Sequence, residues 1–360
     1  MSLRERHSSM WISDTNSILY QPFRMMLRPM QAYGMYPVNY LPKWVYYLYA
    51  GFLHATLTLP VPILVLVYLF ANNDLSARIV MDALFMFSEI GITIFKYVTV
   101  RLYPENTRRS LEWLENDMFN SYYNDHKKIV QQTSRMCRNT YIWFLITCMI
   151  TLFSWGIRPV FYEEKRLQTA LWLPYDPFNN SYIYYCTLFY IFLCVSNAGF
   201  GNSSMDCLVA GLVCQAAGQI KLIKSTLRDV IKHADEHVSK FSGKLTKDEI
   251  IILRKQHMYD DICQCVDRYN LVKEFVNDIE DTFSAALFWQ FGASVFVICL
   301  GCVQFFFSDT LIIDIYITNW FDLDQKCQKA YLTIMENGKK PLVIKAGKVV
   351  DLSLDTFATV

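Results

Sequence analysis

Long uncharged runs alternate with charged segments along this chain of 360 residues. Asp, Glu, Lys and Arg are all missing from residues 44–73, 139–157, 177–205 and 282–308. Because about 20 apolar residues suffice for a helix to cross a bilayer, each run predicts a membrane span. Pro60 and Pro62 lie inside the first run. We expect them to kink its helix, which a membrane bundle tolerates.

A further apolar segment, residues 83–100, contains Glu89 and Lys96. Charged side chains inside a span are costly and normally face protein or a water-filled cavity. The two residues share a helical face but lie too far apart for a close contact. They are either a structural pair facing the bundle, with partners on other helices, or the polar edge of a ligand cavity. With this segment, the pattern predicts a bundle of five spans within residues 44–308.

Residues 215–281 change to an amphipathic pattern. Apolar positions such as Ile220, Ile223 and Leu227 keep helical spacing, while lysines and arginines fall between them. Ser242-Gly243 interrupts the pattern. The fourth and fifth spans are therefore predicted to continue beyond the membrane as a long cytoplasmic helical loop.

The chain after residue 308 has a different organisation. An amphipathic helix is predicted over residues 319–336, and Asn337-Gly338 is expected to end it. We interpret residues 309–341 as a cytoplasmic anchor helix region. Residues 342–360 begin apolar but carry four charges, which predicts a truncated last-span segment.

The distribution of Lys and Arg predicts the orientation. Five such residues lie in the N-terminal segment 1–43, seven in residues 101–138 and eleven in residues 214–281. The alternate loops hold only Arg78 in one case and three basic residues in the other. By the positive-inside rule, the N-terminal segment 1–43 is cytoplasmic. The loop that contains Asn179-Asn180-Ser181 is then outside, where Asn179 fits a glycosylation site.

Composition supports a membrane protein. Hydrophobic residues make up 53% of the chain and charged residues 19%, below the usual share of about 25% in soluble domains. The net charge of +1 gives no case for a nucleic-acid partner. Eleven cysteines, several of them in apolar runs, are better interpreted as small buried hydrophobic residues than as a disulfide framework.

Candidate chemistry is sparse. His233 and His237 have the i,i+4 spacing of metal ligands but no evident third ligand, so we interpret them as part of a solvated helix face. Cys299-x-x-Cys302 lies inside the fifth span, and Cys263-x-Cys265 lacks a second pair. We therefore predict no catalytic residues, no metal, no cofactor and no enzyme activity.

Several motifs together resemble the insect olfactory receptor family. They are Tyr33-Gly34-Met35-Tyr36-Pro37, Gln290-Phe291, Asn319-Trp320-Phe321-Asp322 with Leu323, and Lys340-Pro341-Leu342. The cytoplasmic N-terminus and the long basic loop between the fourth and fifth spans agree with this resemblance. A G-protein-coupled receptor has its N-terminus outside, so the charge pattern argues against that class. The predicted fold class is an all-α, multi-pass transmembrane helical bundle with a cytoplasmic N-terminus and a cytoplasmic helical anchor region.

The resemblance implies an odorant receptor, a ligand-gated cation channel subunit in the plasma membrane of an olfactory sensory neuron. It also implies a tetrameric hetero-oligomer with an olfactory co-receptor, surrounded by membrane lipid, and a small volatile odorant as ligand. That odorant is expected in the outer half of the bundle. With the orientation above, the candidate ligand-binding residues are Phe85, Met86, Glu89, Ile150, Phe153, Ser154, Trp155, Tyr185, Leu188, Phe189 and Phe192.

The chain departs from the family near residue 308. Members have seven spans, but residues 308–319 contain no run of membrane length, so a sixth span is missing. The end of the seventh is missing too. This favours a splice variant, a pseudogene product or a gene-prediction error over a different fold. The alternatives are a gustatory receptor-type channel, a non-functional truncated odorant receptor, and a solute transporter, for which no internal repeat is found.

Overall fold

All five predicted spans are largely helical, the first being divided between two helices. The computed structural model describes residues 12, 17–72, 75, 77–161, 165–240, 246–308, 320–322, 324–338, 344–346 and 350–352. The helices are α2 (Gln21–Ala32), α3 (Lys43–Leu57), α4 (Pro60–Ala71), α5 (Ala77–Leu102), α6 (Pro104–Glu112), α7 (Asp117–Asn120), α8 (Lys127–Ile157), α9 (Ser181–Ser239), α10 (Lys247–Ser308) and α12 (Gln325–Gly338). Short 3-10 turns are η1 (Trp113–Glu115), η2 (Asn124–His126), η3 (Arg158–Phe161) and η4 (Trp320–Asp322), and the strands are β1 (Ile344–Ala346) and β2 (Val350–Leu352).

Four helical stretches among the described residues are long and apolar enough to cross a membrane. They are Lys43–Ala71, Asn124–Phe161, Ser181–Ser239 and Lys247–Val303. The first is divided between α3 and α4 at Thr58 and Leu59, where Pro60 begins the second helix. Helix α5, which contains Glu89 and Lys96, is not among the four. Its crossing of the membrane remains a prediction.

The outer faces of α8 and α10 are apolar. Phe153 of α8 is 68% exposed, and Phe288 and Phe291 of α10 are 71% and 72% exposed. Soluble proteins rarely expose apolar surface on this scale. In a bilayer, the same side chains contact lipid.

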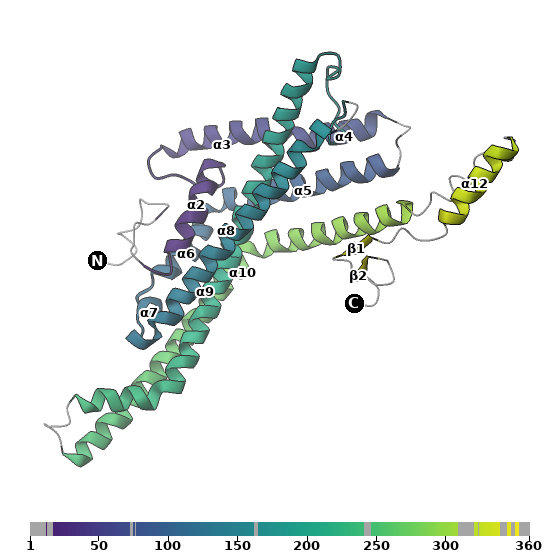
Figure 1. Ribbon diagram of the computed structural model, residues 1–360. Helices are drawn as coiled ribbons and strands as arrows, with labels where there is room; N and C mark the ends of the chain where they lie inside the picture. The colour runs from purple at the N-terminus through teal and green to yellow at the C-terminus, as the bar shows by residue number, and fades with distance from the viewer. Residues whose placement is uncertain are drawn as a thin grey trace.

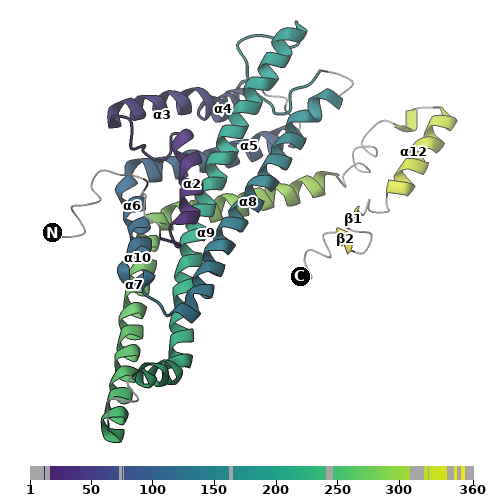
Figure 2. The same cartoon turned by 60° about the vertical axis from the view of Figure 1, so that its left-hand side comes forward.

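Helices α9 and α10 extend well beyond a bilayer. They contain 59 and 62 residues, and at about 1.5 Å per residue each is roughly 90 Å long, three times the hydrocarbon thickness. The early part of α10 lies against the end of α9, and its later part extends away from α8 and α9 (Figures 1 and 2). The predicted extension of both spans as helices is therefore present. The predicted break at Ser242-Gly243 lies outside the described residues.

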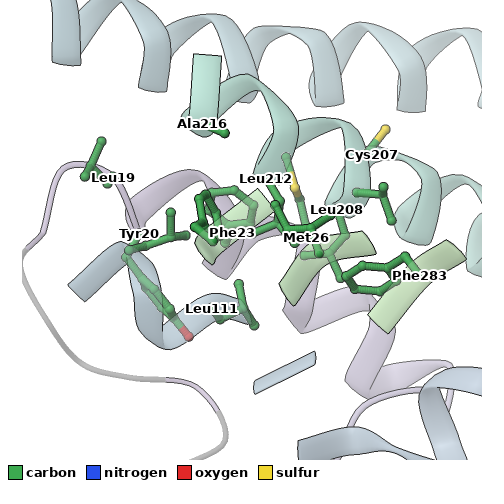
Figure 3. Close-up of a cluster of buried hydrophobic side chains, with 14 of the residues drawn as sticks. Leu19, Tyr20, Phe23, Met26, Leu111, Cys207, Leu208, Leu212, Ala216 and Phe283 are labelled. Atoms are coloured by element: carbon green, nitrogen blue, oxygen red, sulfur yellow. The ribbon is translucent and has the colours of Figure 1, made fainter. Parts of the chain in front are cut away.

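Helix α2 lies at the centre of the main apolar core. Its buried side chains Phe23 and Met26 lie with Leu208 and Leu212 of α9 and with Phe283 of α10 (Figure 3). No membrane-length run marks this segment in the sequence, but its apolar residues recur every three or four positions. The N-terminal segment therefore fixes where α9 and α10 lie.

The Tyr33–Pro37 motif ends α2 in a Schellman turn. The N–H of Met35 donates to the carbonyl of Met30 at 2.8 Å, and the N–H of Gly34 donates to that of Gln31 at 3.2 Å. Gly34 has φ +73°, and a Cβ there would lie 2.9 Å from the Cβ of Ala50. Both the left-handed backbone and the close approach of α3 require glycine.

Helix α12 lies apart from the other helices in both views (Figures 1 and 2). Helix α12 agrees with the helix predicted over residues 319–336. Residues 342–360 were predicted as a truncated span, but their described part forms the antiparallel ribbon of β1 and β2. The backbone register of the ribbon pairs Lys345 with Asp351. The predicted absence of a sixth span concerns residues that the structure does not describe.

Candidate ligand site and polar networks

An apolar cluster fills the space between α4, α5 and α9. We call it the α4–α5–α9 cluster, and its buried members are Val61, Val65, Ala83, Ile90, Leu171, Ile191, Cys194 and Ala198. Leu171 comes from the loop between α8 and α9, and Trp155 of α8 packs against the cluster from the side. The cluster is thus enclosed by four helices and one loop, the setting in which bundles hold apolar ligands.

Hydrogen bonds hold that loop against the helices. The N–H of Trp172 donates to the carbonyl of Leu64 at 3.1 Å, and the hydroxyl of Tyr184 donates to the carbonyl of Arg166 at 3.0 Å. The side-chain amide of Gln168 also donates to the carbonyl of Trp155. These contacts fix the loop as a cover over the α4–α5–α9 cluster.

Some predicted ligand residues lie at this cluster. Met86 and Trp155 pack against it directly. The ring of Phe192 lies so close to Gly156 that a Cβ there would be 2.7 Å away, which places the ring beside Trp155. Leu188 is half-buried on α9. These four residues remain candidates for ligand contact.

Other predicted ligand residues face outwards. Exposed side chains are those of Phe85, Glu89, Ile150, Phe153, Ser154, Tyr185 and Phe189. Successive helical residues point about 100° apart, so Phe153 and Trp155 lie on different faces of α8. Position along a span indicates the depth of a residue in the membrane but not the direction of its side chain. The structure therefore does not gather the predicted set around one space.

A polar network links α3 to α9. His54 Nε2 lies 2.9 Å from the carbonyl of Tyr33, and its Nδ1 lies 2.8 Å from Thr58 Oγ1. The side-chain amide of Asn197 donates to the same hydroxyl at 2.9 Å. A carbonyl only accepts, so Nε2 carries a proton and Thr58 links the imidazole to α9. No sequence pattern indicates this network, because its members lie far apart in the chain.

Lys96 has its partners on α9. Its ammonium group donates to Asn202 Oδ1 at 2.6 Å and to a carboxylate oxygen of Asp206. The lysine side chain is 2% exposed, whereas Glu89 lies on the exposed side of α5. For Lys96, the structure supports the interpretation as a bundle-facing residue with partners on another helix.

A second polar network lies near the far end of α9. Asp125 and His126 of η2 face Asp229 and His233, and we call these four residues the η2–α9 network. Tyr123 lies beside them: its ring stacks on that of His233 with centroids 3.7 Å apart, and its hydroxyl donates to Asp261 of α10 at 2.7 Å. Burial and that hydrogen bond raise the pKa of Tyr123, so the phenol stays protonated.

The prediction that His233 lies on a solvated helix face is wrong. Its side chain is 1% exposed, because η2 and Tyr123 cover this part of α9. Its partner is not His237, whose ring lies 4.2 Å from that of His257 on α10. His233 contacts Tyr123 and Asp125, and His237 contacts His257, so neither histidine has its partner within the His233–His237 motif.

The remaining sequence candidates have the following positions. Asn179 is exposed in the loop just before α9, and its glycosylation remains a prediction. Cys299 is exposed on α10 and Cys302 is half-buried. Cys265 is a buried member of the main core, in agreement with its interpretation as a small hydrophobic residue.

Comparisons with known proteins agree with this architecture. A family model described as 7tm odorant receptor matches residues 77–317 and 306–360. Odorant receptor Or1 of Anopheles gambiae is 23% identical over 259 residues, which cover 60% of this chain and 62% of the mosquito protein. Putative odorant receptor 85e of Drosophila melanogaster is 24% identical over 148 residues, or 40% of this chain and 30% of the fly protein. The chain thus spans less than two thirds of the length of either curated relative.

The solved structure of the olfactory receptor OR5 from Machilis hrabei has a similar fold. Its TM-score is 0.61 at 12% identity, and the match covers 95% of this chain and 94% of that one. The same receptor in complex with eugenol gives a TM-score of 0.59 at 11% identity, with the same coverage. At these identities, the likeness concerns the fold alone. It confirms the predicted all-α, multi-pass transmembrane bundle.

The family match extends over most of the chain and includes the motifs that carried the resemblance after residue 77. The long helices α9 and α10 and the later helix α12 follow one another in the order that the sequence predicted. The chain belongs to the 7tm odorant receptor family.

Proposed function

We propose that this chain is an odorant-binding subunit of a ligand-gated cation channel. In this proposal it acts with an olfactory co-receptor in the plasma membrane of a sensory neuron. Membership of the odorant receptor family supports the receptor role. The fold shared with an insect olfactory receptor solved in complex with eugenol supports a small volatile ligand.

The observation that carries the proposal is the α4–α5–α9 cluster and its cover. The cluster is apolar, has an aromatic side chain at its edge in Trp155, and is bounded by the loop that carries Leu171. Hydroxyl groups occur nearby, as in the contact between Tyr175 and Thr187 at 2.9 Å. Sites for small apolar ligands combine such walls with a few polar groups. We place the odorant against Met86, Trp155 and Phe192.

Helix α9 provides a route from this site to the rest of the molecule. It contacts the cluster through Ile191 and Cys194, the Lys96 ion pair through Asp206, and the η2–α9 network through His233. An odorant that binds the open state more tightly shifts the population toward it. A continuous rigid helix then carries the change across the membrane.

The proposed orientation places the N-terminal segment and the η2–α9 network in the cytoplasm. The distribution of Lys and Arg supports this, since the basic segments 101–138 and 214–281 lie on one side. Asn179 then lies outside, within reach of glycosylation.

The sequence around residues 308–319 favours a second candidate function. In it, the chain is a truncated receptor that does not conduct cations by itself. The family match consists of two parts that overlap over residues 306–317, where the sequence lacks a sixth apolar run. In this alternative the chain keeps the helices of the odorant site but not the complete channel. The gustatory alternative has no comparable support.

Co-expression with an olfactory co-receptor tests both candidates. Cells expressing the chain as written, or the chain with a sixth and a complete seventh span added, are exposed to a panel of volatiles while cation current is recorded. Cells with the co-receptor alone are the control. Current in the extended form only supports the truncated candidate, and current in both supports a complete subunit. Silence of both forms across a broad panel contradicts the receptor proposal.

A further inference from the structure

The η2–α9 network brings together three metal-ligating side chains. Oxygen and nitrogen atoms of Asp125, His126 and His233 all lie within 4.8 Å of one another. Asp125 and His126 are consecutive residues of η2, whereas His233 comes from α9, more than 100 positions later. Asp229, one helical turn before His233, places its Oδ2 3.1 Å from His126 Nε2. The cluster therefore exists only because η2 packs on α9.

Both histidines are enclosed. The side chains of His126 and His233 are 4% and 1% exposed. His233 Nε2 lies 3.2 Å from Asp125 Oδ2, but its Nδ1 is buried and has no hydrogen-bond partner among the described residues. Nearly all buried polar atoms in proteins have a partner. Among the described residues, the observed hydrogen bonds thus satisfy only one of the two ring nitrogens of His233.

The spacing of the ligand atoms suits a small tetrahedral cation. Zinc binds His nitrogen and carboxylate oxygen at about 2.0–2.2 Å, so two ligand atoms of one tetrahedral ion lie about 3.3 Å apart. The pair Asp125 Oδ2 and His233 Nε2 is 3.2 Å apart, and the pair Asp229 Oδ2 and His126 Nε2 is 3.1 Å apart. Asp125, His126 and His233 each offer one ligand atom within 4.8 Å of the other two, so a single ion requires these side chains to draw closer together.

We propose that Asp125, His126 and His233 form a binding site for a divalent transition-metal ion of the zinc type. Mixed imidazole and carboxylate ligands favour zinc over calcium or magnesium, which prefer sites made of oxygen alone. Asp229 contributes the neighbouring carboxylate at His126. The bound ion links η2, and with it the start of α8, to α9.

The ammonium group of Lys232 competes with a metal ion for the carboxylate of Asp125. Its ammonium group donates to Asp125 Oδ2 at 3.0 Å, the oxygen that also faces His233. Glu236 Oε1 lies 3.7 Å from the same ammonium group. The lysine therefore has a second carboxylate to pair with when an ion takes its place at Asp125. Removing its charge is expected to strengthen metal binding.

The neighbouring histidine provides a matched control. His237 follows His233 by one turn on α9, so the sequence offers these two as a metal-binding pair. In the structure His237 instead lies against His257 of α10. The two histidines are therefore separated by their contacts, and substituting each in turn distinguishes the proposed site from an i,i+4 pair.

The experiment uses the full chain, purified in detergent micelles and stripped with a chelator. Co²⁺ is titrated while its visible absorption is recorded, because a tetrahedral site gives a strong and characteristic band; Zn²⁺ is then added to displace it. We expect one Co²⁺ per chain. His126→Gln and His233→Gln should weaken binding at least tenfold, and His237→Gln less than twofold. Lys232→Gln should tighten it severalfold.

Two results overturn the proposal. One is the absence of saturable binding of one ion per chain to the wild type. The other is a loss of Co²⁺ affinity in His237→Gln as large as that in His233→Gln. That result would assign metal binding to the i,i+4 pair of His233 and His237. If the substitutions at the buried histidines fail to give a monodisperse protein, Co²⁺ binding to Lys232→Gln tests the proposal, because that side chain is exposed. Tighter binding in that variant supports the site, and unchanged binding contradicts it.

Discussion

Lys96 of α5 and Asp206 of α9, 110 residues apart in sequence, form an ion pair inside the bundle. The lysine is 2% exposed and the aspartate 35% exposed, so one partner is fully desolvated and the other partly hydrated. Such a pair contributes little net stability when intact, but its loss leaves a buried charge without a counter-charge. The contact therefore fixes α5 on α9 in one register.

Asp206→Asn should destabilise the chain. Breaking a buried ion pair costs about 3–5 kcal/mol, and partial hydration of Asp206 reduces this to about 2–3 kcal/mol. The double variant Lys96→Met/Asp206→Leu should recover most of the loss. Glu89→Gln on the exposed face of α5 is the control and should change little. Thermal unfolding in detergent, followed by size-exclusion chromatography, measures the series; equal loss on Glu89→Gln would favour a pairing of Lys96 with Glu89.

Gly34→Ala should destabilise the turn between α2 and α3. The backbone there has φ +73°, and the added Cβ would lie 2.9 Å from that of Ala50. Strain and overpacking together cost about 2–4 kcal/mol. Gly51→Ala on α3 is the control, since nothing lies within 4 Å of its added Cβ, and helix propensity predicts a gain of up to about 1 kcal/mol. If Gly34→Ala and Gly51→Ala lowered the melting temperature equally, the requirement for glycine at position 34 would be contradicted.

Phe23→Ala should loosen the main core. The ring is fully buried against α9, where an added Cβ at Gly211 would lie 3.1 Å from it. Removing a buried phenylalanine costs about 3–5 kcal/mol. Met25→Ala, on the 42% exposed side of the same helix, should cost less than about 1 kcal/mol. The melting temperature in detergent measures the difference, and equal falls for the two variants would contradict it.

Trp155→Ala should weaken the odorant response if the odorant lies at the α4–α5–α9 cluster. Loss of one aromatic contact, worth about 1.4 kcal/mol or more, raises the half-maximal concentration about tenfold. Phe153→Ala is the control, because that side chain is 68% exposed on another face of α8. Dose–response curves are recorded in whichever form of the receptor conducts with its co-receptor. If Phe153→Ala raised the half-maximal concentration more than Trp155→Ala, the odorant would not lie at the α4–α5–α9 cluster.

Low pH should loosen the start of α12. Asp324 Oδ1 accepts the N–H of Cys327 at 3.3 Å, as an N-cap does. The hydrogen bonds from the side chain and backbone of Cys327 lower the pKa of Asp324 from its ordinary value of 3.8. A pKa lowered by folding gives stabilisation that is full above the unfolded pKa and is lost as pH falls through the folded one.

Hydrogen exchange of the first amides of α12 measures this effect between pH 5 and the acid limit, after correction for the intrinsic pH dependence of exchange. Asp324→Asn keeps the cap, because Asn caps as well as Asp, but should lose the pH dependence. Asp324→Ala should exchange faster at every pH. Persistence of the pH dependence in Asp324→Asn would assign it to another group.

The sequence by itself determined the long apolar and amphipathic helices and the family resemblance, but not the helix α2 or the ribbon of β1 and β2. Runs such as residues 139–157 and 282–308 are free of charge because a bilayer excludes it, and that signal is local. The amphipathic spacing of α12 is local as well. Membership in the odorant receptor family also bears out the prediction that the chain is not an enzyme.

Only the tertiary structure decided which face of each helix meets which neighbour. Lipid and protein interior are both apolar, so the spacing of apolar residues in a span does not reveal its buried side, as Phe153 and Trp155 illustrate. The partners of Lys96 and His233 were likewise hidden, because they come from helices far away in the chain. Composition and charge indicate which segments can cross a membrane, whereas packing between distant segments decides which side chains contact one another.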